Sequence, residues 1–362
     1  MNYGDLINKF HNIAGAKAYR NPKINFDIIH TRLRMIENKS ADFNYKMSEI
    51  ALGTTDDFAE KIVSPLNELN EVKESKVSYS LGDNNKFYPK IADLIVNFID
   101  NNESTLLISC KNKYIDNFLQ SFLAQRVKDK KNYLNGKIVR IGKVSNKNLL
   151  DKYKRFDFEW SKKQNILELK AKNKKLEKAN LFLTKSKEIL KQVDVLNLDN
   201  YSEEERQKNN KKIAEKFSED FKDIETLENL IETRKLIVKG DKRGKLSHRK
   251  EQIDKKLNNI NKTVIERSSV IITTTWKACM DNNLFYERFD NVIILNAGLC
   301  DPVILFLNTG FSDKRLIISS SIEDALNGKS KKYKNFFDYS YLKSKIKDKK
   351  AANSVGVFRK YL

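Results

Sequence analysis

The stretch Phe289–Pro302, FDNVIILNAGLCDP, contains a short and continuously apolar run that leads directly into a turn. The run, Val292–Leu295, is rich in β-branched residues and has no polar residue that would mark a solvent-facing side. Such a strand is buried on both faces, which is typical of a parallel sheet covered by helices on both sides. The stretch therefore predicts a central strand of a parallel sheet.

Four other segments are also short, rich in β-branched residues and largely apolar, and they extend this prediction to a whole sheet. They are Thr105–Ser109 (TLLIS), Lys137–Ile141 (KIVRI), Val270–Thr274 (VIITT) and Arg315–Ser319 (RLIIS). Amphipathic helical stretches at Pro89–Ile99 and Tyr114–Ala124 alternate with the first of these strands. The sequence thus predicts an α/β domain with a parallel sheet, preceded by a helical and polar N-terminal region at residues 1–75.

A helical arm is predicted between the second and third of these strands, at residues 151–267. Three segments in it have the three-to-four spacing of packed helices: Leu169, Leu176, Leu183 and Leu190; Ile213, Phe217, Ile224, Leu227 and Ile231; and Ile253, Leu257, Ile260 and Val264. Polar residues lie on the seam of the leucine helix, at Asn173, Asn180 and Lys187, so an antiparallel arm of about three helices fits better than a parallel zipper. The arm would divide the sheet domain into residues 76–150 and 268–362.

Composition indicates a polyanionic partner. The chain has 362 residues and a formal net charge of +21, which suggests nucleic acid. Its three cysteines, Cys110, Cys279 and Cys300, lack metal-ligand spacing, and its three histidines are scattered, so we expect reduced thiols and no metal site. The sequence contains neither a signal peptide nor a membrane-length apolar run, and we expect a cytoplasmic protein without a membrane partner.

Several motifs in sequence order carry a resemblance to a known family. They are LLISCKNKYIDNFLQSF from Leu106, NGKIVRIGK from Asn135, SSVIITTTWKAC from Ser268, FDNVIILNAG from Phe289 and RLIISSS from Arg315. Together they resemble the first RecA-like domain of superfamily 1 helicases of the nonsense-decay (Upf) type, over roughly residues 75–362. The resemblance implies a P-loop NTPase-like fold, and nucleic-acid contacts from Asn112 and Lys113 and from Thr274 and Thr275.

The residues that the family uses for ATP hydrolysis are missing. In the region of the phosphate-cradling loop only Gly82 and Lys86 match in outline, and Asp83 has the wrong sign for phosphate. Leu295 and Asn296 stand where the family has its metal-binding and water-activating acids, and neither can act as a carboxylate. Two serines, Ser319 and Ser320, replace a Gly-Asp pair.

We therefore expect a helicase-derived, non-hydrolysing subunit that binds nucleic acid, DNA or RNA, or acts as a scaffold in a larger complex. It would use no cofactor, with ATP and Mg²⁺ only if a partner completes the site. That partner would be a second helicase domain, a nuclease or a polymerase. The alternatives are one half of a split helicase and a protein-interaction module that docks through the arm.

Two basic tracts are further candidates for nucleic-acid contact. Residues 234–256, expected at the tip of the arm, hold ten Lys/Arg against three acids, and the candidates there are Arg243, Lys245, Arg249 and Lys250. Residues 329–350 interleave nine lysines with aromatic residues, and the candidates there are Lys331, Lys332 and Lys334. Lysines neutralise phosphates and aromatic rings stack on bases, although those rings could equally form the buried face of an element.

Overall fold

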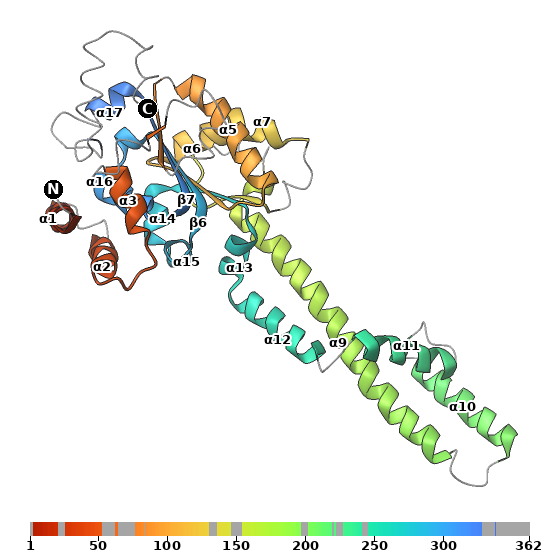
Figure 1. Cartoon of the computed structure of the whole chain (residues 1–362). Helices are drawn as coiled ribbons and strands as arrows, with labels where there is room; N and C mark the ends of the chain where they lie inside the picture. The colour runs from red at the N-terminus through yellow and green to blue at the C-terminus, as the bar shows by residue number, and fades with distance from the viewer. Residues whose placement is uncertain are drawn as a thin grey trace. The chain divides into compact units, whose positions relative to one another are not determined.

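The computed structural model in Figure 1 describes most of the chain, in ranges separated by gaps. The described residues are 3–20, 26–52, 62–63, 77–82, 84–129, 136–145, 154–196, 202–218, 221, 227–240, 245–327 and 337. The chain forms two compact units. Unit 1 comprises Met1–Lys162 and Val264–Leu362, and unit 2 comprises Lys163–Thr263.

A single parallel sheet of seven described strands organises unit 1. The strands are β1 (Ile62–Val63), β2 (Val77–Leu81), β3 (Thr105–Ser109), β4 (Ile138–Arg140), β5 (Val270–Thr274), β6 (Phe289–Leu295) and β7 (Ser312–Ser320). Their order across the sheet is β1-β2-β7-β6-β3-β5-β4, and every pair is parallel. The predicted α/β class and all five predicted strands are confirmed, and the sheet is consistent with a RecA-like fold.

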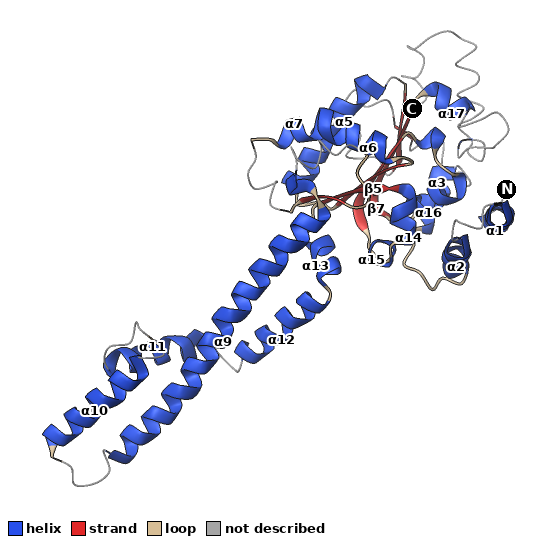
Figure 2. Ribbon diagram, turned by 180° about the vertical axis from the view of Figure 1, so that it is seen from behind, coloured by secondary structure: helices blue, strands red, loops and turns tan. Residues whose placement is uncertain are grey.

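Helices cover both faces of the sheet (Figure 2). One face packs against α1 (Tyr3–Arg20), α2 (Phe26–Glu37), α3 (Tyr45–Leu52), α14 (Thr275–Met280), α15 (Asn282–Phe285), α16 (Pro302–Thr309) and α17 (Ile322–Asn327). The other packs against α5 (Asn84–Asp100), α6 (Asn112–Phe118), a π-helical turn (Leu119–Leu123) and α7 (Ala124–Val127). The result is a layered α/β/α arrangement.

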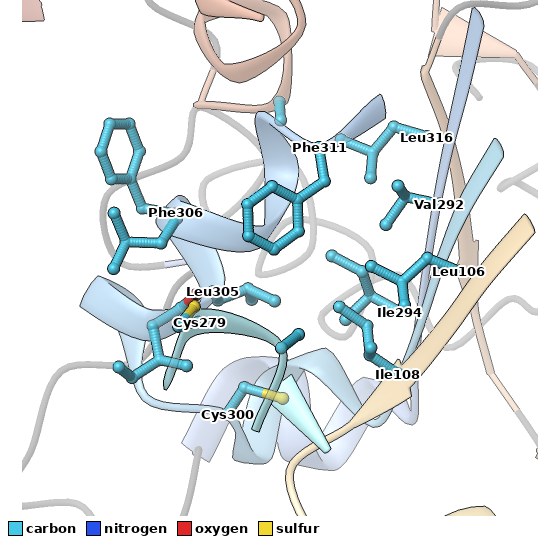
Figure 3. Close-up of a cluster of buried hydrophobic side chains, with 14 of the residues drawn as sticks. Leu106, Ile108, Cys279, Val292, Ile294, Cys300, Leu305, Phe306, Phe311 and Leu316 are labelled. Carbon is cyan, nitrogen blue, oxygen red and sulfur yellow. Dashed lines mark hydrogen bonds between the residues drawn. The ribbon is translucent and has the colours of Figure 1, made fainter. Parts of the chain in front are cut away.

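The alternation of side chains along β6 shows why its apolar run is unbroken. Val292 and Ile294 belong to the core beneath α16, whereas Ile293 and Leu295 belong to the core beneath α5. Figure 3 shows the first of these cores, in which Val292 and Ile294 lie on the sheet opposite Phe311. Because both faces are buried, each of these side chains contributes roughly 1.5–3 kcal/mol, and no position is left for a polar residue.

The N-terminal helices are part of this core. Phe10 packs against Phe306 of α16 with ring centroids 5.0 Å apart. Arg32 of α2 is buried and lies over the ring of Phe285, 3.9 Å from its centroid, while its Nη1 donates to the Tyr286 hydroxyl at 3.2 Å. The region expected to be helical, residues 1–75, also supplies the edge strand β1.

Unit 2 is helical but more interrupted than predicted. It is built from α9 (Phe158–Leu196), α10 (Glu203–Ser218), α11 (Leu227–Gly240), α12 (Lys245–Asn258) and the start of α13 (Ile260–Arg267). The expected second and third helices are each divided in two. The third is divided at Asn259, which follows Asn258 at the end of α12, and asparagine is a poor helix former.

Contacts within unit 2 connect α9 to the segments that follow it. Phe182 of α9 meets Phe221 edge-on, with centroids 5.2 Å apart. Arg234 of α11 donates to Ser186 Oγ of α9 at 3.1 Å, and Leu169 of α9 is buried. Of the other seam leucines, Leu176 and Leu183 are half-buried. Among the remaining predicted apolar positions, Ile224 lies outside the described residues.

Candidate functional site at the carboxyl edge of the sheet

The candidate residues outside the basic tracts end or follow strands of the sheet, or lie in the first turn of α5, near one edge. Because the strands are parallel, their carboxyl ends meet at one edge, where ligands of open α/β sheets bind. The strand order divides this edge in two. We call the ends of β2, β7 and β6 the closed half and the ends of β3, β5 and β4 the basic half.

In the closed half, the connection from β2 to α5 is too short to cradle a phosphate. Only Gly82 and Asp83 separate the two elements, fewer residues than the motif G-x-x-x-x-G-K-[ST] needs. The Gly82 amide donates to the Ser320 carbonyl at 3.0 Å, and a Cβ on Gly82 would lie 2.8 Å from the Phe87 ring. Lys86 lies in the first turn of α5, and its side chain is outside the described part of the structure.

Asn296 is the centre of a buried hydrogen-bond cluster. It adopts a left-handed conformation with φ 55° and ψ 42°, which asparagine tolerates better than most residues. Its Oδ1 accepts hydrogen bonds from the Tyr88 hydroxyl and from Ser109 Oγ, both at 3.2 Å. Burial raises the pKa of Tyr88 to about 12, so the phenol stays protonated and remains a donor at neutral pH.

Leu295 and Asn296, the two positions at which the resemblance led us to look for acids, therefore have structural roles. Asn296 is 3% exposed and hydrogen-bonded, and the fully buried Leu295 belongs to the apolar core beneath α5. The Gly298 amide donates to Ser320 Oγ at 3.1 Å, and a Cβ on Gly298 would lie 2.3 Å from backbone atoms of Asp324 in α17. Side chains and a helix thus fill the closed half.

The basic half is supported by a buried ion pair. Arg140, at the end of β4, is 2% exposed, and its Nε donates to Asp116 Oδ1 of α6 at 3.0 Å. Its Nη2 donates to Asn112 Oδ1 at 2.7 Å and to the Lys143 carbonyl at 3.2 Å, and its Nη1 donates to the Ile141 carbonyl. Burial lowers the pKa of Arg140 and Asp116 opposes that shift, and a guanidinium remains charged in proteins.

The second oxygen of Asp116 fixes the loop that follows β4. Asp116 Oδ2 accepts from the Ser145 amide and from Ser145 Oγ, both at 2.6 Å. Within this loop, Gly142 has φ +102°, a conformation that favours glycine. The network attaches residues 141–145 firmly to α6.

Three lysines project from this supported edge. Lys111 and Lys113 follow β3, Lys143 follows β4, and all three are exposed. Lys277, in α14 after β5, is more enclosed and pairs with Asp281 at 2.9 Å. Exposed ammonium groups such as these can attract phosphates.

The structure distributes the candidate nucleic-acid residues unevenly. Lys113 is exposed, but Asn112 is half-buried and its amide oxygen is taken by Arg140. Thr274 caps α14 by accepting from the Lys277 amide at 3.2 Å. Thr275 is 3% exposed, so it does not present its side chain to a ligand in this structure.

Arg140, Asp116 and Lys143 were not predicted from the sequence as parts of the site. A signal for the first was present, because an arginine inside the apolar run KIVRI needs a partner if the strand is buried. Which acid that partner is could not be read from the sequence.

The basic tract at 234–256 is not at the tip of the arm as expected. It lies on α11 and α12, which contact α9 at Ser186 and Glu177 rather than at the end of α9. Arg249 is exposed, whereas Lys250 pairs with Glu177 at 3.2 Å. The remaining candidates of the two tracts, or their side chains, lie outside the described residues: Arg243, Lys245, Lys331, Lys332 and Lys334.

The described ranges show neither a cluster of metal ligands nor a helix of membrane-spanning character. In the described ranges, no group of three or more His, Cys, Asp or Glu side chains is arranged to hold a metal ion. No helix in the same ranges combines the length and the apolar character needed to cross a membrane. In comparisons with known proteins, no family model matches the chain, and no curated protein matches its sequence.

Proposed function

We propose that this chain is a helicase-derived subunit that binds nucleic acid through the basic half of its sheet edge and does not hydrolyse ATP. The observation that carries the proposal is the row of exposed lysines, Lys111, Lys113 and Lys143, at the ends of nearby strands. It agrees with the resemblance of this chain to superfamily 1 helicases, whose corresponding loop touches the nucleic-acid backbone.

The chemistry of this edge suits phosphates. Lysine ammonium groups neutralise phosphates without reading bases, so binding should depend little on sequence. The Arg140–Asp116 network attaches the loop carrying Lys143 to the helix carrying Lys113, which supports a fixed distance between them. The formal net charge of +21 adds long-range attraction for a polyanion.

The closed half supports the second part of the proposal. Hydrolysis requires a loop that cradles the phosphates and acids that organise Mg²⁺ and water. Here a two-residue connection replaces that loop, Leu295 is in the core, and Asn296 accepts hydrogen bonds from two hydroxyls.

Binding is tested by fluorescence anisotropy with a labelled single-stranded oligonucleotide of mixed sequence. If six or more phosphates are engaged, affinity should fall by about 10³-fold between about 50 and 200 mM salt. An uncharged oligonucleotide analogue of the same sequence is the matched control and should not bind. Affinity that is unchanged across the salt range would contradict binding through phosphates.

The absence of hydrolysis is tested separately in a steady-state ATPase assay with and without the oligonucleotide. We expect turnover below about 0.1 per second, since typical enzymes run near 10 per second. Faster turnover that disappears in Lys86→Ala would overturn this part of the proposal and leave the binding surface untouched.

A further inference from the structure

Two leucines on one face of α9 are exposed, in a helix that also carries many lysines. The side chains of Leu167 and Leu181 are 61% and 48% exposed. They are separated by 181 − 167 = 14 residues, two heptads, or about four helical turns. The two leucines therefore lie on the same side of the helix, away from the buried Leu169.

Lysines fill the space between the two leucines on that side. Lys170, Lys174 and Lys178 follow Leu167 at steps of three and four residues, and all three are exposed. Residues at these steps are neighbours on a helix surface. Together the five side chains form one continuous surface within unit 2, which we call the Leu–Lys stripe.

We infer that the Leu–Lys stripe binds an acidic amphipathic helix of a partner protein by coiled-coil pairing. The partner helix would present apolar residues about two heptads apart, opposite Leu167 and Leu181, and Asp or Glu between them, opposite the lysines. Burial of the leucines would supply affinity, and the charges would set register and partner choice.

The charge of the stripe argues against two other occupants. A second copy of this chain would bring Lys170, Lys174 and Lys178 against the same lysines, which like-charge repulsion disfavours. A nucleic acid would satisfy the lysines but would leave two large leucines exposed at heptad spacing, which phosphate binding does not require. An acidic amphipathic helix would bury the leucines with its apolar residues and pair with the lysines through its carboxylates.

This inference does not depend on the proposed nucleic-acid surface. The Leu–Lys stripe lies in unit 2, and the lysines of the basic half lie in unit 1. Either proposal can fail while the other stands, because each is measured with a different probe and different variants.

The experiment uses the full chain and a fluorescein-labelled peptide of about three heptads, long enough for helical pairing. The peptide carries leucines two heptads apart and glutamates between and beside them, and a matched peptide carries lysines instead of the glutamates. We expect the acidic peptide to bind at micromolar concentration, more weakly at high salt, and the basic peptide to bind at least about 10-fold more weakly.

Two sets of variants locate the binding surface. The pair Leu167→Ser and Leu181→Ser, and the triple reversal of Lys170, Lys174 and Lys178 to Glu, should each weaken binding at least about 10-fold. The matched control reverses Lys175, Lys187 and Lys191, which are exposed on other sides of α9. It changes the net charge equally and should shift the affinity by no more than about 2-fold.

Three outcomes would overturn the inference. The first is an acidic peptide that does not bind below about 1 mM. The second is equal weakening by the stripe reversal and by the control reversal. The third is peptide binding that is unchanged by the leucine substitutions, together with binding of a labelled oligonucleotide that the stripe reversal abolishes. That result would make the stripe a nucleic-acid surface. Unfolding midpoints of all variants should match the parent, because the substituted side chains are exposed.

Discussion

The two halves of the carboxyl edge have the same architecture but different chemistry. Both are formed by the ends of parallel strands in one sheet. In the closed half, the buried Asn296 accepts hydrogen bonds from two neutral hydroxyls, that of Tyr88 and that of Ser109 at the neighbouring end of β3. In the basic half, the buried charges of Arg140 and Asp116 neutralise each other, and the exposed charges are those of lysines. A parallel sheet brings the ends of its strands to one edge. Whether that edge is accessible to a ligand depends on the side chains that lie there.

The largest expected effect is the loss of the buried ion pair under the basic half. Arg140→Met should destabilise the fold by about 3–5 kcal/mol, because it leaves the carboxylate of Asp116 buried without its partner. Chemical denaturation monitored by circular dichroism measures this. The double variant Arg140→Met with Asp116→Leu is the control and should recover much of the loss, since it removes both charges. A single variant as stable as the parent would show that the pair does not support the edge.

The next effect concerns the accessible surface of the basic half. Reversing Lys111, Lys113 and Lys143 to Glu should weaken oligonucleotide binding by about 10²-fold at low salt and reduce the salt slope by about 2. The matched control reverses Lys39, Lys46 and Lys128, exposed lysines that lie outside the basic half. Equal losses in both variants would mean that only total charge matters, and the two halves would then not differ in function.

A smaller effect distinguishes how tightly the two halves are packed. Gly298→Ala in the closed half should destabilise the fold by about 1–3 kcal/mol, because the new Cβ meets backbone atoms of Asp324 that cannot easily move. Gly142→Ala in the basic half has space for its Cβ, with its nearest neighbour at 3.6 Å, and should cost about 1 kcal/mol through its positive φ alone. Thermal unfolding of the two variants, side by side, tests the order. The reverse order would mean that the closed half is less tightly packed around Gly298 than the basic half is around Gly142.

The smallest effect isolates one hydrogen bond of the closed half. Tyr88→Phe removes the donor to Asn296 and should cost about 1 kcal/mol at neutral pH, with Ser109 still donating. Burial raises the pKa of Tyr88 from its ordinary 10.0 to about 12, so the unfolded chain releases this proton at lower pH than the folded chain. Stability should therefore fall as the pH rises from 10 to 12, and this part of the fall should be absent in Tyr88→Phe. Identical alkaline profiles would show that the phenol is not buried.

Local composition was enough to predict five of the seven described strands and the parallel α/β class. Unbroken apolar runs such as Val292–Leu295 can only be satisfied by burial on both faces, so their local composition is enough to predict a parallel sheet. Strand β2 was not predicted, because Ser78 and Ser80 interrupt its apolar residues. The lack of acids at Leu295 and Asn296 was equally visible, because residue identity alone decides whether a carboxylate is present.

The roles of the residues at the sheet edge depend instead on which strands and helices are neighbours. Gly82, Gly298 and Ser320 come from different parts of the chain, and the strand order brings them together. Likewise, Arg140 pairs with Asp116, 24 residues away in the sequence, and donates to the amide oxygen of Asn112. The resemblance had assigned Asn112 to nucleic-acid contact. The pattern of apolar and polar residues along a strand indicates only which of its faces are buried. The identity of a hydrogen-bond or ion-pair partner depends on which elements become neighbours, and that is settled by packing of the whole fold.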